Sequence, residues 1–181
     1  MNNTIIRFEN VTKSYDDGTV VLKNINFELE RGKFYTLLGP SGCGKTTLGR
    51  TILRLHEPTS GEVLFKKLDG EVVDITKLKK EELRRLRPQI QIIFQDPYSS
   101  LSPRMPVGEI IGEAVRVHNI VSKEEYKDYI LDVMKKCGLQ THYFERYPHE
   151  FSGGQRQRIC IARALALKPR LVICDEPVSA L

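Results

Sequence analysis

The chain has 181 residues, 40% of them apolar, and a formal net charge of +5, so it is long enough for one large domain with a buried core. Charged residues make up 28% of the chain and form no long run of one sign, which argues against a disordered tail and against a basic stripe for nucleic acid. The first residues have no signal-peptide pattern, and no apolar run approaches the ~20 residues that span a bilayer. The four cysteines show no C-x-x-C spacing, which argues against a zinc site and indicates reduced thiols in a soluble, cytosolic protein.

The first third of the chain predicts a small antiparallel sheet. Residues 5–11 alternate apolar and polar side chains, as half-buried strands do. A turn signal at residues 16–18 separates them from residues 20–29, which alternate in the same way. Residues 58–61 predict a further turn, and the apolar runs on either side of Asp69-Gly70 predict a hairpin.

A glycine-rich stretch within this part fits G-x-x-x-x-G-K-[ST], the pattern of a phosphate-binding loop. The apolar run 34–38 predicts a buried parallel strand before it, and residues 46–55 predict a helix after it. Glycines let backbone N–H groups turn around an anion, and a helix N-terminus favours negative charge. Lys45 is expected to reach the β- and γ-phosphates, and the Thr46 hydroxyl to bind Mg²⁺. The predicted nucleotide-binding residues of this stretch are Gly39, Pro40, Ser41, Gly42, Cys43, Gly44, Lys45, Thr46 and Thr47.

The middle of the chain predicts a helical lobe. Residues 79–87 read as a helix that Pro88 ends, and residues 90–94 as a strand that leads into Gln95. The Ser- and Pro-rich segment up to Met105 is expected to be a loop. Apolar stripes then predict helices over residues 107–117 and 122–137, the second of which opens with capping-box spacing.

The last part predicts a helix and a buried strand. The helix opens at Ser152, again with capping-box spacing. The apolar strand 171–174 is followed by Asp175, a ligand for Mg²⁺, and Glu176, a base for the attacking water. The phosphate loop alone leaves kinases, GTPases, motor ATPases and transport ATPases open. The expected buried face of the helix comprises Ile159, Ala162, Leu165 and Ala166.

Residues 151–158, Phe-Ser-Gly-Gly-Gln-Arg-Gln-Arg, resemble the signature motif of the ATP-binding-cassette (ABC) family, usually Leu-Ser-Gly-Gly-Gln. The resemblance covers nearly the whole chain and implies an α/β fold: a P-loop NTPase (RecA-like) core with an N-terminal antiparallel β subdomain and an inserted α-helical subdomain. It divides a single domain into a nucleotide-binding core with its β lobe (1–96), a helical subdomain (97–151), and the signature helix with the Walker B strand (152–181).

The resemblance also implies roles for individual residues. Tyr15 matches the aromatic residue that stacks on adenine, and Gln95 the glutamine that reaches Mg²⁺ and the attacking water and links to a membrane subunit. The implied catalytic residues are Glu176, Gln95 and Lys45, and the cofactors are ATP and Mg²⁺. The implied metal ligands are Thr46, Gln95 and Asp175. The implied contacts to ATP on a partner cassette are Ser152, Gly153, Gly154 and Gln155.

Within the family, residues 94–105 and 147–151 look like the oligopeptide, dipeptide and nickel importer branch. The implied function is hydrolysis of ATP at the cytoplasmic face of the cell membrane to energise peptide import. The implied partners are a second ATP-binding subunit (identical or different), transmembrane permease subunits and, indirectly, an extracytoplasmic substrate-binding protein, with no nucleic acid. Two alternatives remain open, namely a nickel importer of the same branch and a soluble cassette ATPase outside transport. The ordinary helices between Gln95 and Ser152 favour transport, since soluble cassette ATPases carry two cassettes or a long coiled-coil insertion.

Family members continue past the position of Leu181 with an aspartate, another core strand and a switch histidine. The four histidines all precede Asp175, so none matches that switch residue, and we interpret them as surface or local packing residues. We therefore expect a truncated cassette with weak ATPase activity and a sheet edge prone to association. These histidines are His56, His118, His142 and His149.

Overall fold

The structure is a computed structural model that describes residues 3–175. The chain divides into two compact units, residues 1–90 and 91–181, and each is described here by itself.

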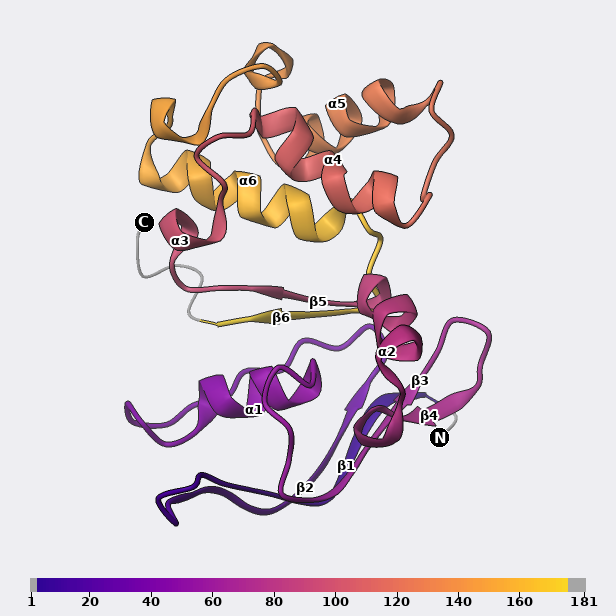
Figure 1. The fold of residues 1–181 in the computed structure, drawn as a ribbon, viewed down its shortest axis with the longest axis vertical. Helices are drawn as coiled ribbons and strands as arrows, with labels where there is room; N and C mark the ends of the chain where they lie inside the picture. The colour runs from indigo at the N-terminus through magenta and orange to yellow at the C-terminus, as the bar shows by residue number, and fades with distance from the viewer. Residues whose placement is uncertain (1–2, 176–181) are drawn as a thin grey trace. The chain divides into compact units, whose positions relative to one another are not determined.

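The N-terminal unit is built on a four-stranded antiparallel sheet in the order β2-β1-β3-β4 (Figure 1). Its core lies on the alternating apolar positions of the strands, where Phe8 pairs with Phe27 on one side and with Val63 on the other. The rings of Phe8 and Phe27 stack with centroids 4.5 Å apart. The predicted sheet and hairpin are therefore confirmed. The strands are β1 (Thr4–Ser14), β2 (Val20–Glu30), β3 (Ser60–Lys66) and β4 (Val72–Asp74).

Gly61 lies inside β3, so the turn predicted at residues 58–61 is wrong in its second half. Its φ of 88° is left-handed, and a Cβ there would meet the Asn10 carbonyl oxygen at 2.5 Å. The pairing of β1 with β3 shifts register between Glu9 and Thr12, beside this glycine. The glycine thus serves a bulge in a strand, where close approach of another backbone has the same sequence signal as a turn.

Two helices complete this unit, α1 (Lys45–Ile52) and α2 (Lys80–Leu86). Short 3₁₀ turns follow β4 (Ile75–Lys77) and α2 (Arg87–Gln89). Helix α1 buries Leu48 and Ile52 as predicted, but it ends earlier than expected and leaves Leu55 exposed. The reason is local, because Arg54 adopts a left-handed φ of 49°, which no α-helix continues through.

Residues 34–38 do not form the predicted buried strand. The structure assigns no strand to residues 33–40, and Phe34 and Leu38 are 95% and 90% exposed. A buried parallel strand needs neighbouring strands to pair with. The four-stranded sheet of this unit does not include the segment, and the Tyr35 hydroxyl, which accepts from the Glu30 amide at 3.0 Å, ties it to the end of β2.

The C-terminal unit combines a two-stranded sheet with a helical lobe (Figure 1). The predicted strands, the two lobe helices and the helix after residue 152 are all present, so the prediction of these elements is confirmed. The strands are β5 (Ile90–Ile93) and β6 (Leu171–Cys174). The helices are α3 (Pro97–Ser100), α4 (Val107–Val117), α5 (Tyr126–Lys136) and α6 (Gly153–Leu165), with 3₁₀ turns at Thr141–Tyr143 and Pro148–Glu150.

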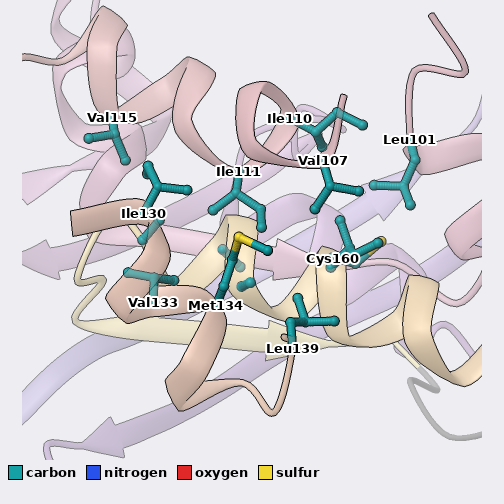
Figure 2. Packing of buried hydrophobic residues seen from close by; sticks show 14 of the residues in the cluster. Leu101, Val107, Ile110, Ile111, Val115, Ile130, Val133, Met134, Leu139 and Cys160 are labelled. Atoms are coloured by element: carbon teal, nitrogen blue, oxygen red, sulfur yellow. The ribbon is translucent and has the colours of Figure 1, made fainter. Parts of the chain in front are cut away.

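The core of this unit lies between α4, α5 and α6, where Figure 2 shows Ile111, Ile130 and Met134 converging. Three expectations are corrected. The loop predicted up to Met105 contains the short helix α3. Helix α5 begins at Tyr126 instead of residue 122, because Ser122 and Glu125 bond to each other in a turn before the helix. Leu165, placed on the buried face, is exposed at the end of α6.

Candidate functional site

The phosphate-loop pattern folds into a tight loop that ends at the first turn of α1. Gly42 and Gly44 have φ values of 79° and 96°, and Gly44 is the residue that caps the helix. The first N–H groups of an α-helix have no acceptor within the helix, and they carry the positive end of its dipole. The loop and the helix start together therefore offer donors to an anion, as the sequence predicts.

Gly44 also packs against β2, where a side chain would crowd its neighbours. A Cβ built there would lie 3.0 Å from Val21 Cγ1, 3.1 Å from the Val21 carbonyl oxygen and 3.2 Å from Leu22 Cδ2. Figure 1 shows α1 beside the β1–β2 hairpin. The same contact that fixes the start of α1 therefore places the hairpin next to the phosphate loop.

Lys45 folds back over its own loop. Its Nζ donates to the carbonyl oxygens of Gly39 at 2.8 Å and Pro40 at 2.9 Å, and lies 3.7 Å from Cys43 Sγ. Such an ammonium group is a compact charge with three donors, and a phosphate oxygen within the loop could replace either carbonyl as its partner. The other predicted residues of the loop are also gathered here: Ser41 at its tip, and Thr46 and Thr47 in the first turn of α1.

Tyr15 lies in the turn between β1 and β2. Its amide donates to the Thr19 carbonyl at 3.0 Å, and the Gly18 amide donates back to the Tyr15 carbonyl at 2.9 Å. The side chain is 38% exposed, so part of its ring is open to a ligand. Val21 follows this turn on β2 and packs next to Gly44. The turn that carries Tyr15 and the phosphate loop therefore lie close together in the N-terminal unit.

The sequence did not reveal the partner of Tyr15. Its hydroxyl lies 3.2 Å from His56 Nδ1, and the two rings meet edge to face at 6.1 Å. The residues are 41 positions apart, and nothing in the local pattern at residue 56 signals the contact. The sequence alone indicates a surface or packing role for His56, and its place beside Tyr15 adds it to the candidate site.

In the C-terminal unit, the structure brings Gln95 and Asp175 to one end of the two-stranded sheet. Strands β5 and β6 run in the same direction (Figure 1), and the Asp175 amide donates to the Ile93 carbonyl at 3.0 Å. Gln95 follows Ile93 by two residues, so both predicted Mg²⁺ ligands leave the sheet at its carboxyl end. The catalytic base predicted next to them, Glu176, lies outside the described residues.

The expected donors fit a magnesium ion in their chemistry. Thr46, Gln95 and Asp175 offer a hydroxyl, an amide and a carboxylate oxygen, and Mg²⁺ prefers oxygen ligands with one or two carboxylates, substrate phosphates and waters. Among residues 3–175 no group of three or more His, Cys, Asp or Glu side chains is placed to hold a metal ion by itself.

The signature stretch begins helix α6 as predicted. The Ser152 hydroxyl accepts from the Gln155 amide at 3.3 Å, and Gln155 Oε1 accepts from the Ser152 amide at 3.0 Å, which is a complete capping box. Gly153 and Gly154 form the first turn, so their backbone is bare at the helix start. Phe151, which stands where relatives of this motif usually have Leu, is buried with its ring edge-on to Tyr143 at 5.1 Å.

Two arginines of α6 support these segments, and sequence reasoning missed both. Arg156 is only 7% exposed, and its Nε donates to the Pro148 carbonyl at 2.8 Å, which anchors the 3₁₀ turn before the signature. Arg163 Nη1 donates to the Ser100 carbonyl at 2.6 Å and so holds α3, just after Gln95, against α6. A buried arginine that binds backbone carbonyls has no sequence pattern, because its acceptors are not side chains.

The family model described as "ABC transporter" matches residues 22–179. The oligopeptide transport ATP-binding protein AppF of Bacillus subtilis is 49% identical over 158 residues, which cover 87% of this chain and 46% of that protein. The dipeptide transport ATP-binding protein DppF of Escherichia coli is 48% identical over 160 residues, which cover 88% of this chain and 46% of that protein. The chain thus spans about half the length of these curated relatives. No helix within residues 3–175 has the length and apolar character needed to cross a membrane.

Solved structures agree with the sequence relatives. The dimeric cassette MJ0796, in a post-hydrolysis state bound to ADP and Pi, matches with a TM-score of 0.85 and 33% identity over 98% of this chain and 76% of that chain. The protein cbiO1 of Clostridium perfringens, part of the ABC transporter complex cbiONQ, matches with a TM-score of 0.82 and 31% identity, over 99% of this chain and 68% of that chain. These matches confirm the predicted α/β fold class with a P-loop NTPase core. The chain belongs to the ABC transporter family.

Proposed function

We propose that this chain binds ATP with Mg²⁺ and acts in ATP hydrolysis as the ATP-binding subunit of a peptide importer. The observation that carries the proposal is the loop of residues 39–46, in which left-handed Gly42 and Gly44 and the folded-back Lys45 stand at the N-terminus of α1. Few arrangements other than a phosphate site explain two left-handed glycines and a cation together at a helix start.

In this proposal each residue has a distinct task. The amides of residues 39–47 and the Lys45 ammonium bind the phosphates, and Tyr15 stacks on the adenine. Thr46, Gln95 and Asp175 would hold Mg²⁺, which supplies charge neutralisation at the β- and γ-phosphate oxygens when bound. Gln95 orients the attacking water and Glu176 takes its proton. Residues 152–155 contact the ATP of a second cassette through the exposed start of α6.

The peptide assignment is supported by the relatives AppF and DppF, which are named as ATP-binding proteins of oligopeptide and dipeptide transport. The MJ0796 structure is a dimer, which supports pairing with a second ATP-binding subunit, identical or different. Transmembrane permease subunits and, indirectly, an extracytoplasmic substrate-binding protein complete the proposed assembly at the cytoplasmic face of the membrane. The alternatives are nickel import and a soluble ATPase outside transport.

Measuring the uptake of peptide and of nickel distinguishes peptide import, nickel import and a soluble ATPase. A strain that lacks the gene should lose uptake of a labelled peptide and keep uptake of radiolabelled nickel, and the intact gene should restore the peptide uptake. Complementation with Glu176→Gln should fail, because the variant keeps the shape of the side chain but not the base. Loss of nickel uptake alone would replace the proposal with the nickel alternative, and loss of neither would favour the soluble ATPase.

A further inference from the structure

His56 is held firmly against the ring that the proposed function assigns to adenine. The amides of Leu55 and His56 both donate to the Arg50 carbonyl, at 2.9 and 3.3 Å, which fixes the chain just after α1. From this position the imidazole meets the Tyr15 ring edge to face, with an interplanar angle of 83° and Nδ1 3.2 Å from the hydroxyl. The contact therefore links the turn of the β1–β2 hairpin to the end of the phosphate-loop helix.

The surroundings of His56 favour its neutral form. Partial burial lowers the pKa of His56, and the positive charges of Arg50 on α1 and Lys13 on β1 lower it further. A neutral imidazole with its proton on Nε2 leaves Nδ1 free to accept the Tyr15 hydroxyl proton. Lys13 Nζ also lies 5.2 Å from the centre of the Tyr15 ring, over one face. The tyrosine is thus restrained at its edge, at its hydroxyl and on one face.

We infer that His56 is a positioning residue for the nucleotide base: it holds the Tyr15 ring in place so that the ring is ordered before adenine stacks on it. The inference rests on the proposed function, in which Tyr15 contacts the base. An exposed tyrosine that is already ordered loses less side-chain entropy when a ligand binds. His56 contacts Tyr15 and the Arg50 carbonyl, so we expect its effect to be confined to the base end of ATP.

Two probes separate the base from the phosphates. Isothermal titration calorimetry with ATP and with inorganic tripolyphosphate, both with Mg²⁺, gives the ratio of the two affinities for each variant. One neutral hydrogen bond and a ring contact correspond to roughly a 2- to 10-fold change in binding. We expect His56→Ala to weaken the binding of ATP by that factor and to leave the affinity for tripolyphosphate unchanged. Tyr15→Ala should weaken the binding of ATP by at least as much, again without changing the affinity for tripolyphosphate.

Two further variants exclude a general structural effect. His56→Gln keeps an acceptor and a donor near the hydroxyl and should recover most of the ATP affinity. His142→Ala removes a histidine that is also edge-on to a tyrosine, Tyr143 at 4.5 Å, but lies in the other unit, and it should leave the ratio unchanged. Circular dichroism confirms that each variant is folded.

The possible results distinguish a failure of the positioning role of His56 from a failure of the proposed function. Equal loss of ATP and tripolyphosphate affinity in His56→Ala, or no loss of either, overturns the positioning role while the phosphate site stands. An unchanged ratio in Tyr15→Ala overturns it as well, since there is then no base contact to position. If the unmodified chain binds neither probe, the proposed function itself fails.

Discussion

Replacing Gly44 with alanine tests whether packing against β2 fixes the start of α1. The backbone there has a φ of 96°, which an L-residue reaches only at a cost of about 1–2 kcal/mol. The new methyl group would also meet three atoms of Val21 and Leu22 at 3.0 to 3.2 Å, one of them a backbone oxygen that cannot rotate away. Overpacking of this kind costs about 1–3 kcal/mol. The free energy of unfolding should therefore fall by about 2–5 kcal/mol.

Gly42 provides the matched control two residues earlier. Its φ is also left-handed, at 79°, but a Cβ there would meet nothing within 4 Å. Gly42→Ala should therefore carry only the backbone strain, about 1–2 kcal/mol. Loss of glycine freedom in the unfolded chain is common to both variants and cancels in the comparison.

Urea unfolding followed by far-ultraviolet circular dichroism measures both variants against the unmodified chain. The reasoning requires Gly44→Ala to be less stable than Gly42→Ala by about 1–3 kcal/mol. Equal stabilities would show that the contact with Val21 does not hold the loop, and that the phosphate loop and the hairpin are not packed as the structure has them.

Three further predictions follow from the two units. Arg156→Met leaves backbone carbonyls of the turn before the signature unpaired and should lower the free energy of unfolding by about 1–3 kcal/mol in the urea experiment. Arg158 also donates to a backbone carbonyl, that of Gly138 at 3.2 Å, but this bond is exposed to water, so Arg158→Met should lower the free energy of unfolding by less than Arg156→Met. Ser152→Ala removes a helix cap and should cost about 1 kcal/mol, and Ser122→Ala, which caps no helix, should cost less. His56 has its pKa lowered by folding, so between its folded and unfolded pKa values the unfolded state binds more protons and stability rises with pH. Its contribution should be complete above pH ~6.5 and lost as the pH falls through the lower folded value, and a pH series of melting curves should show this dependence flattened in His56→Ala.

Sequence patterns sufficed for several elements whose signal is local. Alternation along residues 5–11 predicts β1, the apolar stripe predicts α4 with its observed ends, and the capping box at Ser152 appears with both of its hydrogen bonds. The glycine and lysine spacing of the phosphate loop likewise predicts a conformation that the structure shows.

Several of the failures depend on contacts between distant residues. The run 34–38 has the composition of a buried strand, but composition does not supply the partner strand that burial requires. Gly61 reads as a turn because only the neighbouring strand reveals its bulge. Arg156 and His56 act through a backbone carbonyl and a tyrosine that the chain brings near only on folding. The roles of the individual site residues, Glu176 among them, and the division into subdomains stay predictions.

The central claim is that ATP binds at the phosphate loop, and removing the charge of Lys45 tests it most directly. Charge-assisted contacts to phosphate contribute about 1.5–3 kcal/mol, so Lys45→Ala should weaken MgATP binding roughly 10- to 100-fold in isothermal titration calorimetry. Lys23→Ala, which removes an exposed lysine of β2 and the same net charge, should leave the affinity within about 2-fold. A folded Lys45→Ala chain that binds MgATP as tightly as the unmodified chain would contradict the account.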